Sequence, residues 1–157
     1  MDYREKLIEY GEDIITSNNM NIEKKCLQHG KITVYEHSIN VAIVALILAE
    51  RMSISVDERS MVRGALLHDY FLYDWHDKNN GVKLHGWKHP KIALDNALKE
   101  FELNEIEQDV ICRHMFPFTI TPPKHKEGWL VTMADKICAV YETVPIPSML
   151  KVEELYG

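Results

Sequence analysis

Cysteine is scarce in this sequence, and no hydrophobic run is long. The three cysteines, Cys26, Cys112 and Cys138, are an odd number without CxxC spacing, which argues against a disulfide framework and against a zinc knuckle. The longest apolar run, VAIVALILA at 41–49, is far too short to span a bilayer and predicts a core helix. The first residues, MDYREKLIEYGED, lack the basic and then apolar order of a signal peptide, so we expect a cytoplasmic protein.

Basic residues are outnumbered by acidic ones. The chain has 18 Lys and Arg against 24 Asp and Glu and a net charge of −6, whereas binding to a nucleic-acid backbone relies on clustered Lys and Arg. We therefore expect neither a nucleic-acid partner nor a membrane partner. A small charged substrate is still compatible, because a local metal centre can outweigh the charge of the whole protein. The length suits one domain over residues 1–157, and it leaves a monomer and a homodimer both open.

Strand signals are nearly absent, and apolar residues recur with the period of an α-helix. The predicted fold class is therefore all-α, a compact helical bundle. Helices are predicted over residues 2–17, 33–51, 56–71, 89–101, 104–114 and 127–143. A capping box of Thr33 with Glu36 marks the start of the second predicted helix, and one of Ser55 with Glu58 marks the start of the third. Residues 72–88, rich in His, Asp, Asn and Gly, form the longest candidate functional loop.

Two histidines and two aspartates fall on helix faces that should point inward. His37 and His68 each share a helical stripe with apolar residues, so both face the core. Asp69 can approach the same point, and Asp135 lies in the apolar helix LVTMADKICAV, where a bare carboxylate is costly to bury. A lone histidine on an apolar face is more often a hydrogen-bonded core residue. The four together instead indicate a nitrogen and oxygen site for Mn, Fe, Co, Ni, Mg or Zn.

The same residues stand in short motifs that resemble a known family. YEHS around His37, LLHD around His68 and Asp69, and MADK around Asp135 have the order and helical context of the HD-domain superfamily of metal-dependent phosphohydrolases. The resemblance covers about residues 33–143 and implies a helical bundle of the HD-domain type. It also implies one divalent metal ion with four ligands: His37, His68, Asp69 and Asp135.

Two further histidines resemble the binuclear branches of that superfamily. His89 in HGWKHP and His114 in VICRHMFP look like the ligands of a second ion in bacterial dinucleoside tetraphosphate hydrolases and HD-GYP phosphodiesterases. The resemblance then makes Asp69 a bridging ligand. The alternative is a single ion, with His89 and His114 acting on substrate phosphate or on the ligands. His85 competes with His89, and we favour His89 because it precedes Pro90, which fits the first turn of a helix.

The residues after the His–Asp pair depart from the family. Tyr70-Phe71-Leu72 stand where many members have Ile-Gly-Lys, so the lysine is absent. The substrate phosphate must then bind to the metals or to another cationic side chain. The candidates for this side chain are Lys88, Arg113 and Lys136. The candidate catalytic residues are Asp69 and, as general acids for the leaving oxygen, His85 and Asp74. The tripeptide that names the HD-GYP branch is absent too, which disfavours cyclic dinucleotides as substrates.

Other histidines and several aromatic residues have less specific roles. His29 and His125 lie among lysines and are predicted to be solvated surface residues. Five aromatic residues lie near the predicted site: Tyr70, Phe71, Tyr73, Trp75 and Trp87. They can stack on a nucleotide base, or they can cover the edge of the core and shape the pocket, which is the commoner use.

The sequence therefore predicts a metal-dependent phosphohydrolase. The expected substrate is a phosphate ester or anhydride of a small molecule, such as a nucleotide or a dinucleoside polyphosphate, cleaved by water that one or two divalent ions activate. The rival hypothesis is a regulatory HD module that retains the metal and binds a nucleotide without turnover. The missing lysine favours that rival.

Overall fold

The computed structural model describes residues 2–79, 81 and 83–144. The elements are α1 (Tyr3–Ile15), α2 (Met20–Glu23), β1 (Leu27–His29), β2 (Ile32–Thr33), α3 (Val34–Arg51), α4 (Glu58–Leu67), α5 (His85–Glu100), α6 (Glu105–Arg113) and α7 (Lys126–Thr143). Seven helices and one two-stranded sheet in this part of the chain confirm the all-α class. No helix within the described ranges combines the length and the hydrophobicity that a membrane crossing needs. The predicted domain also includes residues 145–157, which lie outside the description.

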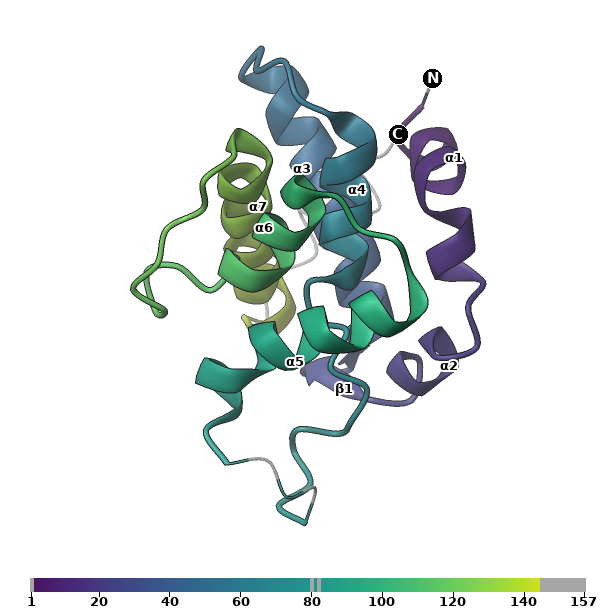
Figure 1. Cartoon of the computed structure of the whole chain (residues 1–157), viewed down its shortest axis with the longest axis vertical. Coiled ribbons are helices and arrows are strands. Elements are labelled where there is room, and N and C mark those ends of the chain that lie inside the picture. Colours follow the sequence, from purple (N-terminus) through teal and green to yellow (C-terminus); the bar gives the residue numbers. More distant parts are fainter. Residues whose placement is uncertain (1, 80, 82, 145–157) are drawn as a thin grey trace.

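Helices α3 and α4 lie at the centre of the molecule (Figure 1). Helix α3 packs on α4 and α7, and α4 also packs on α1 and α6. Helix α3 begins with the predicted capping box, in which Thr33 Oγ1 accepts from the Glu36 N–H and the Glu36 carboxylate accepts from the Thr33 N–H. Helix α5 crosses one end of the bundle, and the segment between α4 and α5 lies at that same end (Figure 1). Residues at the C-terminal end of α4 therefore lie near the meeting point of several helices.

The start of α4 differs from the prediction. The proposed box of Ser55 with Glu58 is wrong, because Asp57 is the N-cap and its side chain accepts from the Ser60 N–H at 2.9 Å. The Asp57 N–H itself donates to Glu127 Oε1 at 2.9 Å, so a contact with the first turn of α7 fixes the chain before α4 in an extended conformation. The helix also ends at Leu67 rather than at 71, with His68 as its C-cap.

Helix α5 begins at His85, four residues before the predicted start. Leu84, with φ 59°, turns the chain into the helix without a side-chain cap. Pro90 lies inside α5, so the prediction that it marks the first turn is wrong. The proline removes one helical hydrogen bond but allows the first turn to form ahead of it. Residues 80 and 82 of the predicted loop lie outside the described residues.

A short hairpin that the sequence did not predict lies against α3 and α7. Strands β1 and β2 pair antiparallel. Gly30, with φ 57°, makes the turn, and a Cβ atom there would lie 3.2 Å from the backbone oxygen of Glu142 in α7. The hairpin places His29 half-buried, with its ring 5.3 Å from the ring of His37. The prediction that His29 is a solvated surface residue is therefore wrong, and His125, at the N-cap of α7, is half-buried as well.

Candidate metal centre

The six predicted metal ligands meet at one place inside the bundle. Helices α3, α5 and α7 contribute one residue each, and the other three directly follow α4 or α6. The six are His37, His68, Asp69, His89, His114 and Asp135. Five of them are buried, and the Asp135 side chain is 13% exposed. Residues that are up to 98 positions apart in the sequence are therefore in contact.

The carboxylate of Asp69 lies between two sets of histidines. Its Oδ2 atom is 3.3 Å from His68 Nε2 and 3.9 Å from His37 Nε2. Its Oδ1 atom faces the other way, 3.2 Å from His89 Nε2 and 3.5 Å from His114 Nε2. Each oxygen of Asp69 thus faces a different set of histidines.

Each set of donors is compact. Asp135 Oδ1 lies 3.0 Å from His37 Nε2 and 3.7 Å from His68 Nε2, and we call these three residues the first ligand group. His89 Nε2 and His114 Nε2 lie 2.9 Å apart, and we call these two residues the second ligand group. Ligand atoms of His37, His68 and Asp135 all lie within 4.8 Å of one another, as do those of His68, Asp69 and His114.

Hydrogen bonds at Nδ1 fix the orientation of all four ligand histidines. In His68, His89 and His114, Nδ1 lies 2.7, 3.1 and 2.8 Å from a backbone carbonyl oxygen three or four residues earlier. In His37 it lies 2.7 Å from Glu142 Oε2. Carbonyl and carboxylate oxygens only accept, so each Nδ1 carries a hydrogen and donates it. In the neutral rings, Nε2 is left with a lone pair that points toward Asp69, as in a histidine that binds metal.

The donor set fits divalent cations. His68 Nε2 and Asp69 Oδ1 are buried and have no hydrogen-bond partner within the described residues. The two Nε2 atoms of His89 and His114 would face each other with lone pairs at 2.9 Å, which is repulsive without a cation between them. Imidazole nitrogen and carboxylate oxygen suit Mn, Fe, Co, Ni or Zn better than ions that prefer thiolates. The buried His and Asp clusters can therefore hold a divalent metal ion.

Electrostatics keep the carboxylates available to a cation. Burial alone would raise the pKa of Asp69, but the positive charge of the adjacent His68 and the nearby imidazoles of His114 and His89 hold that pKa well below its usual range. Burial would also raise the pKa of Asp135, but His37 and His68 outweigh this effect and lower it. Burial lowers the pKa of His37, but its bonds to Asp135 and Glu142 prevail and raise it to about 9. A cation must displace that proton, so metal affinity should fall as the pH falls.

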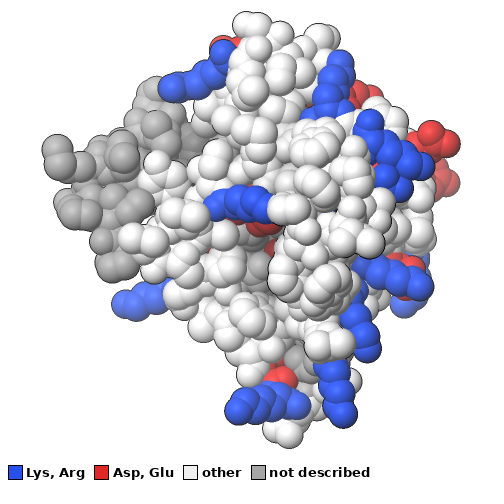
Figure 2. Space-filling view, turned by 90° about the vertical axis from the view of Figure 1, so that its left-hand side faces the viewer, with Lys and Arg blue, Asp and Glu red and all other residues white. Residues whose placement is uncertain are grey.

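The centre opens into a pocket of about 650 Å³. Asp69, His89, His114 and Asp135 line its floor, and Trp75, Met115, Pro117 and Phe118 are among its apolar walls. Figure 2 shows a recess near the middle of one face of the molecule, with acidic atoms visible beneath a basic side chain. A small molecule with an anionic end and an apolar body fits such a pocket.

The three predicted phosphate-binding cations lie in different surroundings. Lys136 lines the pocket, and its Nζ atom donates to the His114 carbonyl at 3.2 Å. Arg113 is held by the Pro122 carbonyl at 2.9 Å and the Asp109 carboxylate at 3.2 Å. Lys88 is exposed on α5, and neither Lys88 nor Arg113 is among the lining residues. Lys136 is thus the one basic side chain that the described structure brings to the pocket.

Of the two candidate general acids, one lines the pocket and the other does not. His85 lines the pocket, and its Nδ1 lies 2.7 Å from the hydroxyl oxygen of Tyr73. Burial and the neighbouring His89 lower the pKa of His85 to about 4, so its ring is neutral at pH 7. The Asp74 side chain is half-exposed, accepts from the His76 N–H at 2.9 Å and does not line the pocket.

The aromatic residues divide between core and pocket. Tyr70 is buried, and its hydroxyl donates to Glu100 Oε2 at 2.7 Å. Phe71 is buried in a small apolar cluster. Trp75 lines the pocket, whereas Trp87 is 54% exposed and packs on Phe118. Of the five, Trp75 is therefore the side chain placed to contact a ligand.

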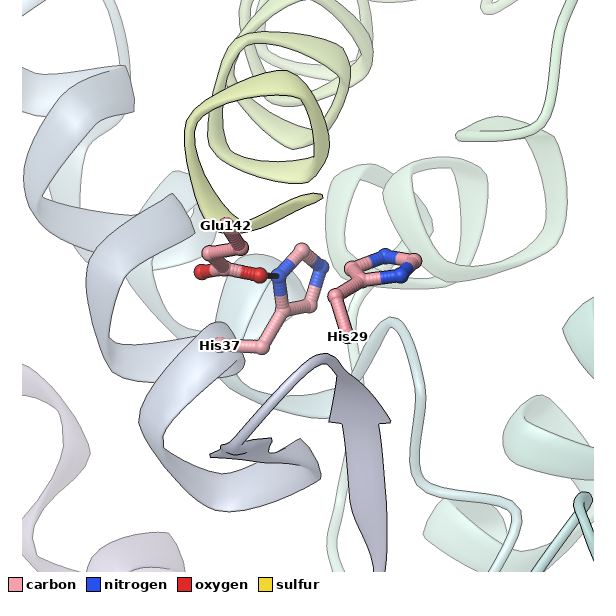
Figure 3. A group of neighbouring side chains, drawn as sticks. All are labelled: His29, His37 and Glu142. Carbon is pink, nitrogen blue, oxygen red and sulfur yellow. Dashed lines mark hydrogen bonds and ion pairs between the residues drawn. The ribbon is translucent and has the colours of Figure 1, made fainter. Parts of the chain in front are cut away.

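Three residues beside the ligands were not predicted from the sequence. Figure 3 shows Glu142 and His29 on the two sides of the His37 ring. Gln28, next to His29 in β1, donates to Asp69 Oδ2 at 2.6 Å. Glu142 lies two helical turns after Asp135, so helical spacing could have indicated that both face α3. Gln28 and His29 carried no comparable signal, because the strand that holds them is three residues long.

Comparisons with known proteins identify the family. Searches of curated proteins and of solved structures find no match. A family model described as the HD domain matches residues 34–140, more than half of the chain, and this range includes all six predicted ligands. Domains of that family are typical of metal-dependent phosphohydrolases. By this match, and with the His–Asp centre in place, the chain belongs to the HD-domain family.

Proposed function

We propose that this protein is a two-ion phosphohydrolase that cleaves a phosphate ester or anhydride of a small molecule, a nucleotide or a dinucleoside polyphosphate. The observation that carries the proposal is the position of Asp69, whose two oxygens face different ligand groups at the floor of an open pocket. Bound divalent ions supply an activated water nucleophile and neutralise charge on phosphoryl oxygens.

The chain's own residues have distinct tasks in this proposal. The first ligand group, the second ligand group and Asp69 hold the ions. Lys136 keeps N–H groups beyond the one given to the His114 carbonyl, and these can donate to a phosphoryl oxygen. His85, with a neutral ring in the pocket wall, is suited to bind phosphate by a hydrogen bond rather than to bring a proton. Asp74 has no task here because it lies outside the lining.

The apolar wall supports a substrate with a flat organic group. Trp75 and Phe118 line the pocket together with Met115 and Pro117. An aromatic side chain stacks on any nucleotide base, because every base has a π-face. A nucleotide with its phosphate at the ligands would place its base against this wall.

The test is hydrolysis of a substrate panel by metal-stripped protein with single metals added back. The panel holds nucleoside mono-, di- and triphosphates and dinucleoside polyphosphates, with Mn, Fe, Co, Ni, Zn and Mg. We expect metal-dependent release of phosphate or nucleotide that Asp69→Ala abolishes, while Asp95→Ala, which removes an exposed carboxylate of α5, leaves it intact. If Asp69→Ala hydrolysed the panel as fast as wild type with every metal, the proposal would be refuted.

A regulatory HD module is the second candidate. One observation favours it: Lys136 alone among the basic residues of the described structure lines the pocket, so a polyphosphate chain meets little protein charge apart from the metals. This candidate predicts tight nucleotide binding by the metal-loaded protein, with intact nucleotide recovered after long incubation. Product formation at any metal would exclude it.

A further inference from the structure

Gln28 links the Asp69 carboxylate to Trp75 in the wall of the pocket. Its side chain is buried and makes two hydrogen bonds. Gln28 Nε2 donates to Asp69 Oδ2 at 2.6 Å, and Gln28 Oε1 accepts from the indole Nε1–H of Trp75 at 3.2 Å. Gln28 lies in β1, Asp69 lies just after α4, and Trp75 lies further along the segment between α4 and α5, so this chain of bonds joins separate parts of the fold.

The two bonds fix the orientation of the amide. An indole N–H can only donate, so the atom that faces Trp75 must be the Gln28 carbonyl oxygen. An ionised carboxylate can only accept, so the amide NH₂ group must face Asp69. If the amide group rotated by 180°, both hydrogen bonds would be lost. Trp75 therefore sets the direction in which Gln28 donates.

The donated bond restrains the rotation of the Asp69 carboxylate. With Oδ2 held by Gln28 on the side of the first ligand group, Oδ1 must point to His89 and His114. Trp75 also reaches the second ligand group through ring stacking. Its indole stacks on His85 at 5.1 Å and 9°, and His85 stacks on His89 at 4.7 Å and 18°. Trp75 thus supports Asp69 through Gln28 and His89 through His85, without being a ligand itself.

We propose that Gln28 and Trp75 are positioning residues that orient Asp69 as the bridge between the two ions. The inference rests on the proposed two-ion centre and adds a relay that starts in the pocket wall. A substrate or product that moves Trp75 would alter the geometry of the bridging carboxylate. Residues that hold a metal ligand by hydrogen bonds commonly change metal affinity by about 10–100-fold when they are replaced.

The test is metal titration of the stripped protein, followed by calorimetry and by the visible spectrum of bound Co²⁺. Gln28→Leu removes both bonds, and Trp75→Phe removes the indole N–H while keeping a ring. Gln28→Glu keeps an acceptor for Trp75 but places a carboxylate against Asp69. Trp87→Phe is the matched control, because Trp87 is exposed and bonds to none of these residues.

We expect Gln28→Leu to lower the binding affinity for one of the two ions by about 10–100-fold and to change the spectrum of bound Co²⁺. Trp75→Phe should have a smaller effect in the same direction, Gln28→Glu should not restore binding, and Trp87→Phe should match wild type. The double variant Gln28→Leu/Trp75→Phe should bind no more weakly than Gln28→Leu alone, because both act through one relay.

Failure of the relay and failure of the proposed function give different results. If wild type binds two ions and all variants bind them with wild-type affinity and spectrum, the relay is refuted while the proposed function stands. If wild type itself binds no ion, the proposed function fails. Melting curves of the stripped variants check the fold, and if Gln28→Leu is unfolded, Trp75→Phe and Gln28→Glu decide the question.

Discussion

Glu23 is a carboxylate buried without a partner, and replacing it should stabilise the protein. It lies in α2, is 1% exposed, and neither of its carboxylate oxygens has a hydrogen-bond partner within the described residues. Burial, and then the charge of Asp69, raise the pKa of Glu23 well above its ordinary value of 4.5. Glu23→Gln keeps the shape of the side chain and removes the group that titrates. It should therefore relieve a cost that the wild type bears at neutral pH.

The size of the effect follows from proton linkage. Between the unfolded and folded pKa values of Glu23, the folded state binds more protons than the unfolded state, so the free energy of unfolding falls as the pH rises. The fall is about 1.4 kcal/mol per pH unit. From pH 5 toward pH 7 the wild type should thus lose up to about 3 kcal/mol that the variant keeps, the loss ending at the folded pKa of Glu23. For a domain of this size, this corresponds to a melting temperature difference of up to ~10 °C.

The assay is thermal unfolding of metal-stripped protein at pH 5, 6 and 7, followed by circular dichroism. The melting temperature of Glu23→Gln minus that of wild type should grow with pH, because other titrating groups cancel in the difference. Glu9→Gln, which changes an exposed carboxylate of α1, should give a difference independent of pH. A pH-independent difference for Glu23→Gln would refute the reasoning, since it would mean that Glu23 is ionised and compensated.

Three other changes test the packing and the centre. Gly64→Ala should lower the free energy of unfolding by about 1–3 kcal/mol in urea titrations, because its Cβ would lie 2.7 Å from Val110 Cβ; wild-type stability would contradict the packing of α4 on α6. Arg63→Ala should cost about 3–5 kcal/mol in the same assay, because buried Arg63 pairs with buried Glu107 at 2.9 Å, and Glu107→Gln should restore part of the loss. Mn²⁺ at 100 times its dissociation constant should add about 2.7 kcal/mol to the stripped protein, and calorimetry that shows no gain would contradict metal binding.

The helical framework could be predicted because its signals are local. The 3.6-residue period and the Thr33–Glu36 box lie within single helices, and both appear in the structure. The start of α4 could not be predicted in this way, because Glu127, 70 residues away, holds the backbone of Asp57. The start of α5 was misplaced because a proline was expected in the first turn, whereas Pro90 lies further inside the helix.

The candidate site could be predicted where its proposed ligands stand in motifs. His37, His68, Asp69, His89, His114 and Asp135 were all chosen from the sequence, and the structure brings them together. The residues around them were missed for a physical reason. Gln28 bonds to Asp69 across 41 positions, from a strand too short to show a period. Contacts of this kind depend on tertiary packing, which no local pattern records.

The most direct test of the central claim is a crystal structure of the metal-loaded protein, with anomalous diffraction measured at the absorption edge of the bound metal. The account predicts two anomalous peaks, one at the first ligand group and one at the second, with a different oxygen of Asp69 directed at each. Absence of any peak, or a single peak remote from Asp69, would contradict it.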